Sequence, residues 1–223
     1  LEFDAIAQAR ACLAVGSVAE PLRRYALGPS LGQCCGGVMH LRFEGVGAED
    51  RDALARRLAP RRDPVALFGG GHVGQALARV LAPLPFQLTW IDSRDGIFPQ
   101  DAPQDVACEH SDPVQAAVPG LAPGARVLIM SFSHAEDLDV VAACLRRQRE
   151  RGDLGFIGLI GSRSKWATFR HRLQERGFTE AELARVTCPI GVSGIAGKAP
   201  EVIAVAVAAQ LLQTLPPDGA GDA

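Results

Sequence analysis

The sequence lacks the features that define several classes of protein. A helix needs about 20 apolar residues to cross a bilayer, and the apolar run that ends at Ala209 is far shorter. There is no excess of basic charge either, because the net charge is −2 and residues of both signs are spread along the chain. A nucleic-acid-binding protein or a polybasic membrane anchor would show such an excess. We therefore expect neither a nucleic acid nor a membrane as a partner.

Cysteine is also scarce, with six among 223 residues. A chain of this length buries a sizeable core and needs no disulfide or metal to stabilise it. Six cysteines therefore do not indicate a disulfide scaffold. We expect a reduced protein of the cytoplasm. Three cysteines lie on apolar faces of the pattern and are predicted to be small core residues: Cys12, Cys108 and Cys144.

The remaining feature of the cysteines is a vicinal pair, Cys34 and Cys35, in the glycine turn Gln33-Cys34-Cys35-Gly36-Gly37. Thiolates bind soft metals and sulfur. Successive side chains of a regular strand point to opposite faces, so both thiols meet one ligand only in an irregular turn, which the glycines permit. The pair is a candidate metal or sulfur contact. The alternative is one buried cysteine and one incidental one.

From Val65 onward the pattern alternates between apolar strands and amphipathic helices. The strands are nearly continuous runs of Val, Leu and Ile, as expected when helices cover both faces of a parallel sheet. The sequence predicts an α/β fold with a Rossmann-like, doubly wound parallel sheet. The predicted strands are 65–68, 86–91, 105–108, 126–131 and 155–160, and the predicted helices are 72–82, 113–118, 137–150, 164–176 and 200–213.

The residues before this region predict a smaller α+β domain, 1–62, which carries the Cys34–Cys35 turn. It has a helix at 1–15, extended runs at 24–27 and 37–43, and a helix at 49–58. Because the first helix has no preceding cap, we expect this domain to be truncated. The linker 60–64 holds two prolines, and the Rossmann-like domain covers 63–214. A Pro/Gly/Asp tail, 215–223, is expected to be disordered.

The most informative motif follows the first strand of the Rossmann-like domain. Gly69, Gly71 and Gly74 match the pattern G-x-G-x-x-G, in which glycines allow a tight turn, close approach of a phosphate, and helix–strand packing. His72, inside the loop, could donate to a phosphate or cap the helix. Asp92 ends the next strand, where a carboxylate would hold ribose hydroxyls. The alternative is a polar residue at a strand end.

Two more glycine-rich loops precede predicted helices. The first, 158–165, carries Arg163 and Lys165, and the second, 188–198, ends at Lys198. Charge-assisted hydrogen bonds from such cations to phosphate are strong. The loops therefore predict an anion-binding surface. Tight turns with solvated basic residues remain the alternative.

These segments together resemble the XdhC/CoxI family, the accessory proteins of xanthine dehydrogenase and related molybdenum hydroxylases. The resemblance rests on 27–37, 67–74, 91–94, 158–165 and 188–201. It implies a chaperone, not a catalyst, that binds the molybdenum cofactor in its molybdopterin form during sulfuration. It implies two partners, a cysteine desulfurase and the large subunit of apo-xanthine dehydrogenase, and allows a homodimer. The implied cofactor-binding residues are Cys34, Cys35, Gly69, Gly71, His72, Gly74, Asp92, Arg163, Lys165 and Lys198, with the two cysteines near molybdenum or its sulfur.

Two other functions stay open. An NAD(P)-dependent oxidoreductase is favoured by the glycine motif and Asp92, and disfavoured because no histidine is clearly paired with an acid for hydride transfer. His134, which follows the fourth strand, is an acid/base candidate or a solvated loop residue. A nucleotide-sensing Rossmann domain would bind its ligand without turnover.

Overall fold

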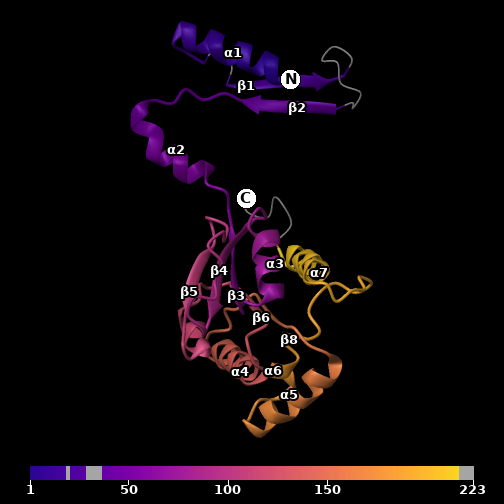
Figure 1. Ribbon diagram of the computed structural model, residues 1–223. Coiled ribbons are helices and arrows are strands. Elements are labelled where there is room, and N and C mark those ends of the chain that lie inside the picture. Colours follow the sequence, from indigo (N-terminus) through magenta and orange to yellow (C-terminus); the bar gives the residue numbers. More distant parts are fainter. Residues whose placement is uncertain (19–20, 29–36, 216–223) are drawn as a thin grey trace. The chain divides into compact units, whose positions relative to one another are not determined.

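The computed structural model describes residues 1–18, 21–28 and 37–215 (Figure 1). The chain divides into two compact units, Leu1–Ala59 and Pro60–Ala223. Within the second unit, the first strand already begins at Asp63, so the last two residues of the expected linker 60–64 belong to the sheet. Apart from Leu215, the tail at 215–223 lies outside the described residues.

The N-terminal unit is a small α+β assembly. Strands β1 (Leu22–Leu27) and β2 (Gly37–Arg42) form an antiparallel pair. Helix α1 (Glu2–Val15) precedes the pair, and the 3₁₀ turn η2 (Ala48–Asp50) and helix α2 (Arg51–Leu58) follow it. None of the described side chains of this unit is buried. Two strands with little buried surface are marginally stable by themselves.

The second unit contains a six-stranded sheet in which every pair of neighbours is parallel. The strand order is β5-β4-β3-β6-β7-β8, the doubly wound order of a Rossmann fold. This confirms the predicted fold class. The strands are β3 (Asp63–Phe68), β4 (Phe86–Asp92), β5 (Ala107–His110), β6 (Arg126–Ile129), β7 (Phe156–Leu159) and β8 (Val186–Thr187).

Besides shifts of one or two residues at the ends of other strands, β8 and β5 differ from the prediction. Strand β8 has only two residues, too few for a pattern in the sequence to reveal. Strand β5 begins at Ala107 instead of 105 and all four of its side chains are exposed, because it is an edge strand. Cys108 lies on it and is therefore exposed, so its prediction as a core residue was wrong. Cys144 is buried, and burial raises the pKa of its thiol to about 12; Cys12 is half-buried.

Helices connect the strands and cover both faces of the sheet (Figure 1). Helix α4 begins three residues earlier than predicted because the Ser133 hydroxyl accepts a hydrogen bond from the Glu136 amide and caps the helix. The predicted helix at 113–118 is a 3₁₀ helix, which has a proline within it at Pro119. The elements are α3 (His72–Leu81), η3 (Val114–Gly120), α4 (His134–Arg151), α5 (Arg163–Glu175), α6 (Glu180–Leu183) and α7 (Pro200–Leu212).

The core of this unit forms two apolar clusters, one on each face of the sheet. Successive residues of β3 alternate between them: Val65 and Leu67 pack with α3 and α7, whereas Ala66 and Phe68 pack with α4 and α5. This alternation is the two-residue period of a strand. It explains why the strands read as continuous apolar runs.

One buried cation links distant parts of this unit. Arg126, at the start of β6, is 5% exposed. It donates to the Asp63 carboxylate at 2.9 Å and to the hydroxyl and carbonyl oxygens of Thr214 at 2.6 and 2.9 Å. A buried guanidinium requires such partners. The first strand and the segment after α7 are thereby joined through one side chain.

Candidate functional site

The glycine loop, Gly69–Gly74, lies where the strand order of the sheet reverses. It follows β3, whose neighbours β4 and β6 lead to opposite edges. A Cβ atom added to Gly69 would lie 2.0 Å from the Met130 carbonyl oxygen, and one added to Gly74 would lie 1.9 Å from the Gly69 carbonyl oxygen. Only glycine fits these two positions. In doubly wound sheets, ligands bind at this reversal point, outside the carboxyl ends of the strands.

The middle glycine of the motif has a different environment. A Cβ atom at Gly71 would meet nothing within 4 Å. Gly71 is also the N-cap of α3 and provides no side chain to bond the first amides of that helix. By contrast, Ser133, Ser162 and Thr179 each cap their helices with a side-chain oxygen. The first amides of α3 therefore remain donors for an anion, helped by the positive end of the helix dipole.

Asp92 lies directly under this loop and is 1% exposed. Its carboxylate accepts hydrogen bonds from the Gly70 amide at 2.6 Å, the Arg94 amide at 2.9 Å and the Arg94 guanidinium at 2.9 Å. Burial alone would raise the pKa of Asp92, but the bonds from Arg94 and Gly70 outweigh it and lower the pKa below its usual value. Through its bond with the Gly70 amide, Asp92 holds the glycine loop against the end of β4.

The second loop, between β7 and α5, uses its lysine internally. The Lys165 ammonium donates to the Asp137 carboxylate at 2.5 Å and to the Ile160 carbonyl oxygen at 2.9 Å. Both side chains are nearly buried. Burial raises the pKa of Asp137, although Lys165 opposes this shift. Lys165 is therefore an ion-pair partner inside the fold, whereas Arg163 beside it is exposed.

Two further groups lie close to this ion pair. The buried hydroxyl oxygen of Ser131 has no hydrogen-bond partner within the described part of the chain. The Cys188 sulfur lies 3.9 Å from the Gly161 carbonyl oxygen. Burial raises the pKa of Cys188 to about 11, although the nearby Lys165 opposes the shift. At neutral pH this thiol is protonated and is a poor nucleophile. His134 is exposed, with its ring edge-on to Phe169.

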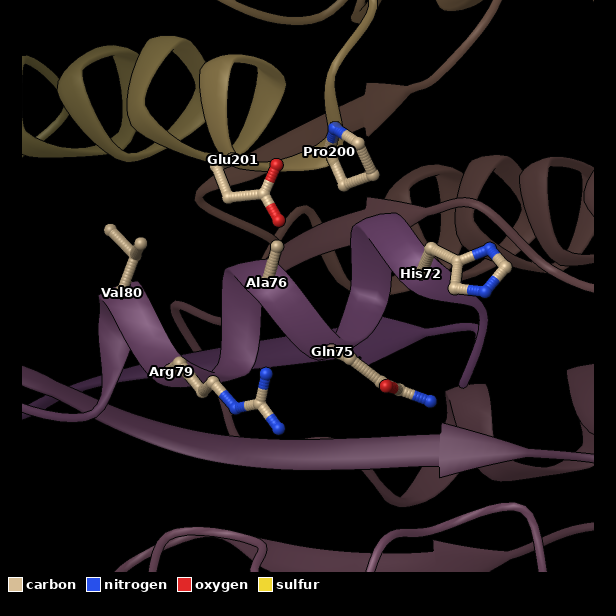
Figure 2. Close-up of a pocket in the computed structure, with 7 residues that line it drawn as sticks. All are labelled: His72, Gln75, Ala76, Arg79, Val80, Pro200 and Glu201. Carbon is tan, nitrogen blue, oxygen red and sulfur yellow. The ribbon is translucent and has the colours of Figure 1, made fainter.

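The third loop leads into α7 and places its start against α3. Lys198, in that loop, is exposed. A groove of about 290 Å³ runs along α3, and its residues come from two elements: His72, Gln75, Ala76, Arg79 and Val80 from α3, and Pro200 and Glu201 from α7. Figure 2 shows the Glu201 carboxylate directed toward α3, with Gln75 and Arg79 on the other side of that helix. His72 joins the groove to the glycine loop.

The vicinal cysteines Cys34 and Cys35 lie outside the described residues. Among the residues that are described, no three His, Cys, Asp or Glu side chains gather as a metal site. No helix in that part of the chain is long and apolar enough to span a membrane.

The structure thus brings several predicted residues to the carboxyl edge of one sheet: Gly69, Gly71, His72, Gly74, Asp92, Arg163 and Lys165. Sequence reasoning missed Asp137, Gln75, Arg79 and Glu201. The three residues His72, Gln75 and Arg79 follow helical spacing on one face of α3, which could have marked that face as polar. Nothing in the sequence connects Asp137 to Lys165 across 28 residues.

Comparison with known proteins gives one family match. Residues 65–211 match the model of the XdhC Rossmann domain. The chain is 26% identical over 185 residues to YqeB, an uncharacterized protein of Escherichia coli K12. That alignment covers 82% of this chain and 31% of YqeB, so the chain spans about a third of this relative.

A solved structure shares the fold of this chain. A Bacillus halodurans protein described as a xanthine dehydrogenase aligns with 86% of this chain and 59% of its own, at a TM-score of 0.56 and 20% identity. A Shigella flexneri protein described as a Rossmann-fold NAD(P)-binding family member aligns with 66% of this chain and 85% of its own, at a TM-score of 0.44 and 17% identity.

Proposed function

Because the chain belongs to the XdhC family, we propose that it is a maturation factor for xanthine dehydrogenase or a related molybdenum hydroxylase. It binds the molybdenum cofactor in its molybdopterin form and holds it while the terminal oxo ligand is exchanged for a sulfido ligand. A cysteine desulfurase supplies the sulfur. The chain then delivers the cofactor to the large subunit of the apoenzyme, and catalyses no turnover of its own.

The observation that carries this proposal is the open N-terminus of α3. Gly71 leaves the first amides of the helix without a side-chain cap, and a Cβ there would meet open space. Molybdopterin carries a phosphate, and such amides bind phosphate. Arg163 and Lys198 are exposed cations that can add charge-assisted hydrogen bonds. Lys165 is paired with Asp137, so we assign it to holding the second loop in place.

We assign the molybdenum end of the cofactor to Cys34 and Cys35. Thiolates are ligands for soft metals and acceptors of sulfur. The pair stands in the glycine-rich segment between β1 and β2, in the N-terminal unit.

Cofactor retention tests this function. Purified protein is mixed with molybdenum cofactor without oxygen and desalted; molybdenum is measured by mass spectrometry and pterin by fluorescence after oxidation. We expect stoichiometric retention, and transfer that activates an apo-hydroxylase. The double substitution Cys34→Ala, Cys35→Ala should abolish molybdenum retention, whereas Cys108→Ala, at an exposed thiol on β5, should not. Size-exclusion chromatography of the same preparation tests the homodimer.

An NAD(P)-dependent oxidoreductase is the second candidate, favoured by the strand order and by the acid at the end of β4. Against it, the Asp92 carboxylate already accepts bonds from Gly70 and Arg94, which leaves it few free lone pairs for ribose. Failure to retain the cofactor, together with saturable NAD(H) binding and turnover, would replace the first proposal with this one. Nucleotide binding without turnover would indicate a sensing domain instead.

A further inference from the structure

The groove along α3 has chemically different sides. Ala76 and Val80 form an apolar floor. The Glu201 carboxylate enters from α7, and Gln75 and Arg79 flank the floor from the opposite side of α3 (Figure 2). A flat ligand with an apolar face could lie on the floor, with hydrogen-bond donors at one edge and negative charge at the other.

The two charged side chains of this groove, Glu201 and Arg79, are largely unengaged, whereas the Gln75 side-chain amide donates to the Gly70 carbonyl oxygen at 3.3 Å. Glu201 is exposed and has no hydrogen bond or ion pair with any described residue. Among the described residues, Arg79 forms one ion pair, a 3.3 Å contact with Asp101 in which both side chains are more than half exposed. Such surface pairs contribute little. A ligand can therefore recruit both residues without breaking a strong interaction.

We propose that Glu201 recognises the 2-amino-4-oxopyrimidine edge of a pterin in this groove. That edge presents two adjacent donors, the ring N–H and the exocyclic amino group, and a carboxylate accepts two parallel hydrogen bonds of this kind. The inference rests on the proposed function, because it assigns a subsite to the pterin part of the proposed cargo. It adds the residue that would select the heterocycle.

The neighbouring glycine loop extends the argument to the anionic end of the ligand. His72 lines the groove and is also the first residue of α3, next to the uncapped amides. Arg79 and these amides carry the positive charge of the region, and Glu201 carries the negative charge. A molecule with donors at one end and a phosphate at the other complements both. Guanine shares the same edge, whereas adenine places a ring acceptor beside its amino group and would meet the carboxylate with a lone pair.

Fluorescence titration tests this assignment with three probes. Pterin-6-carboxylate has the amino edge and an anionic end. Lumazine-6-carboxylate has the same shape but a carbonyl in place of the amino group. Guanosine monophosphate presents the edge on a nucleotide and is tested by competition. We expect the pterin to bind at least about tenfold more tightly than the lumazine, because the lumazine carbonyl would repel the carboxylate.

The substitution Glu201→Gln should remove this preference and weaken pterin binding by about tenfold or more. Arg79→Gln should weaken both pteridines equally, because it acts on their shared anionic group. The matched control is Glu175→Gln, an exposed glutamate on α5. Thermal unfolding should change only slightly in Glu201→Gln, since this side chain bonds to no described residue and loses only its charge in the first turn of α7.

The outcomes separate the groove from the proposed function when cofactor retention is measured on the same preparations. Pterin affinity that does not change in Glu201→Gln, with the cofactor still retained, overturns the groove assignment alone. Absence of both pterin binding and cofactor retention overturns the groove and the proposed function together. Competition by guanosine monophosphate at equal affinity, with the same loss in Glu201→Gln, overturns the pterin and identifies a guanine nucleotide as the ligand.

Discussion

The two strand-to-helix turns at the carboxyl edge, β3–α3 and β7–α5, look alike in sequence and differ in structure. The first turn has no side-chain cap and leaves its helix amides open at Gly71. The second is closed by the Ser162 hydroxyl, which accepts from the Lys165 amide at 3.1 Å, and by the ion pair of Lys165 with Asp137. A glycine-rich turn beside a lysine is therefore not by itself an anion site. Whether such a turn can bind an anion depends on the residue that caps the helix and on the partner of the cation.

The strongest test of this difference is Lys165→Met. It leaves the Asp137 carboxylate buried without its cation, and we expect a loss of about 3–5 kcal/mol in unfolding free energy. The folded-state pKa of Asp137 is already raised. Protonation of this carboxyl group therefore stabilises the folded state. The loss should therefore be largest at neutral pH and shrink as the pH falls toward the pKa of Asp137. Urea unfolding at several pH values measures this.

A double substitution, Lys165→Met with Asp137→Leu, provides the control. It removes both charges, and replacing a buried pair by apolar residues is often close to neutral. If the double variant were as unstable as Lys165→Met, lost packing and not the unpaired carboxylate would be the cause.

Gly74→Ala should be the next largest effect. Its Cβ would lie 1.9 Å from a backbone oxygen, which cannot move aside cheaply, so we expect a loss of about 1–3 kcal/mol or more. Gly161→Ala is the matched change in the second turn. Its Cβ would meet the Lys165 Cδ atom at 2.6 Å, which is a side-chain atom and can shift without moving the backbone. Thermal unfolding of the two variants should differ clearly; equal losses would contradict the tight packing of the first turn.

Asp92→Asn should cost about 1–2 kcal/mol, because it weakens the charge-assisted bonds from Arg94 while keeping the shape. The pKa of Asp92 is lowered in the fold, so its contribution is complete above the unfolded value of about 3.9 and is lost as the pH falls through the folded value. The difference between wild type and variant should therefore vanish in strong acid. A constant difference down to pH 2 would rule out an electrostatic role.

The smallest effects come from exchanging the caps of the two turns. Ser162→Ala should lose about 1 kcal/mol, since it removes a cap. Gly71→Ser should gain a few tenths of a kcal/mol, because a Cβ there is unobstructed. The same substitution should weaken phosphate binding, since the new hydroxyl competes for the open amides. Isothermal titration with inorganic phosphate measures this. Unchanged binding would show that the first amides of α3 do not bind the phosphate.

The local parts of the fold could be predicted from the sequence. The alternation of Val65 and Leu67 with Ala66 and Phe68, together with the glycines that follow, predicts a buried strand entering a turn at a helix. The two-residue strand β8 could not be predicted, because a single bridge leaves no periodicity. The 3₁₀ form of 114–120 was missed because a short apolar pattern with proline fits several helical geometries.

The candidate site was predictable only in part, because its side chains have partners far away in the chain. Gly69, Gly71 and Gly74 have a backbone role that their spacing reveals. The role of Lys165 depends on Asp137, and the groove depends on α7 packing against α3, which brings Glu201 to residues more than a hundred positions earlier. Such pairings are set by topology, and residue type alone does not indicate them.

The buried guanidinium of Arg126 also has a consequence for how this unit opens and where it can be cut. Because it holds both Asp63 and Thr214, fraying at either end exposes the same cation, and amide hydrogen exchange in β3 and in the last turn after α7 should be slow and correlated. The family match ends at 211. A fragment trimmed there would keep the bond from Arg126 to Asp63 but lose both bonds to Thr214. An excised Rossmann-like unit therefore needs to run from before Asp63 to beyond Thr214 to keep its native rigidity.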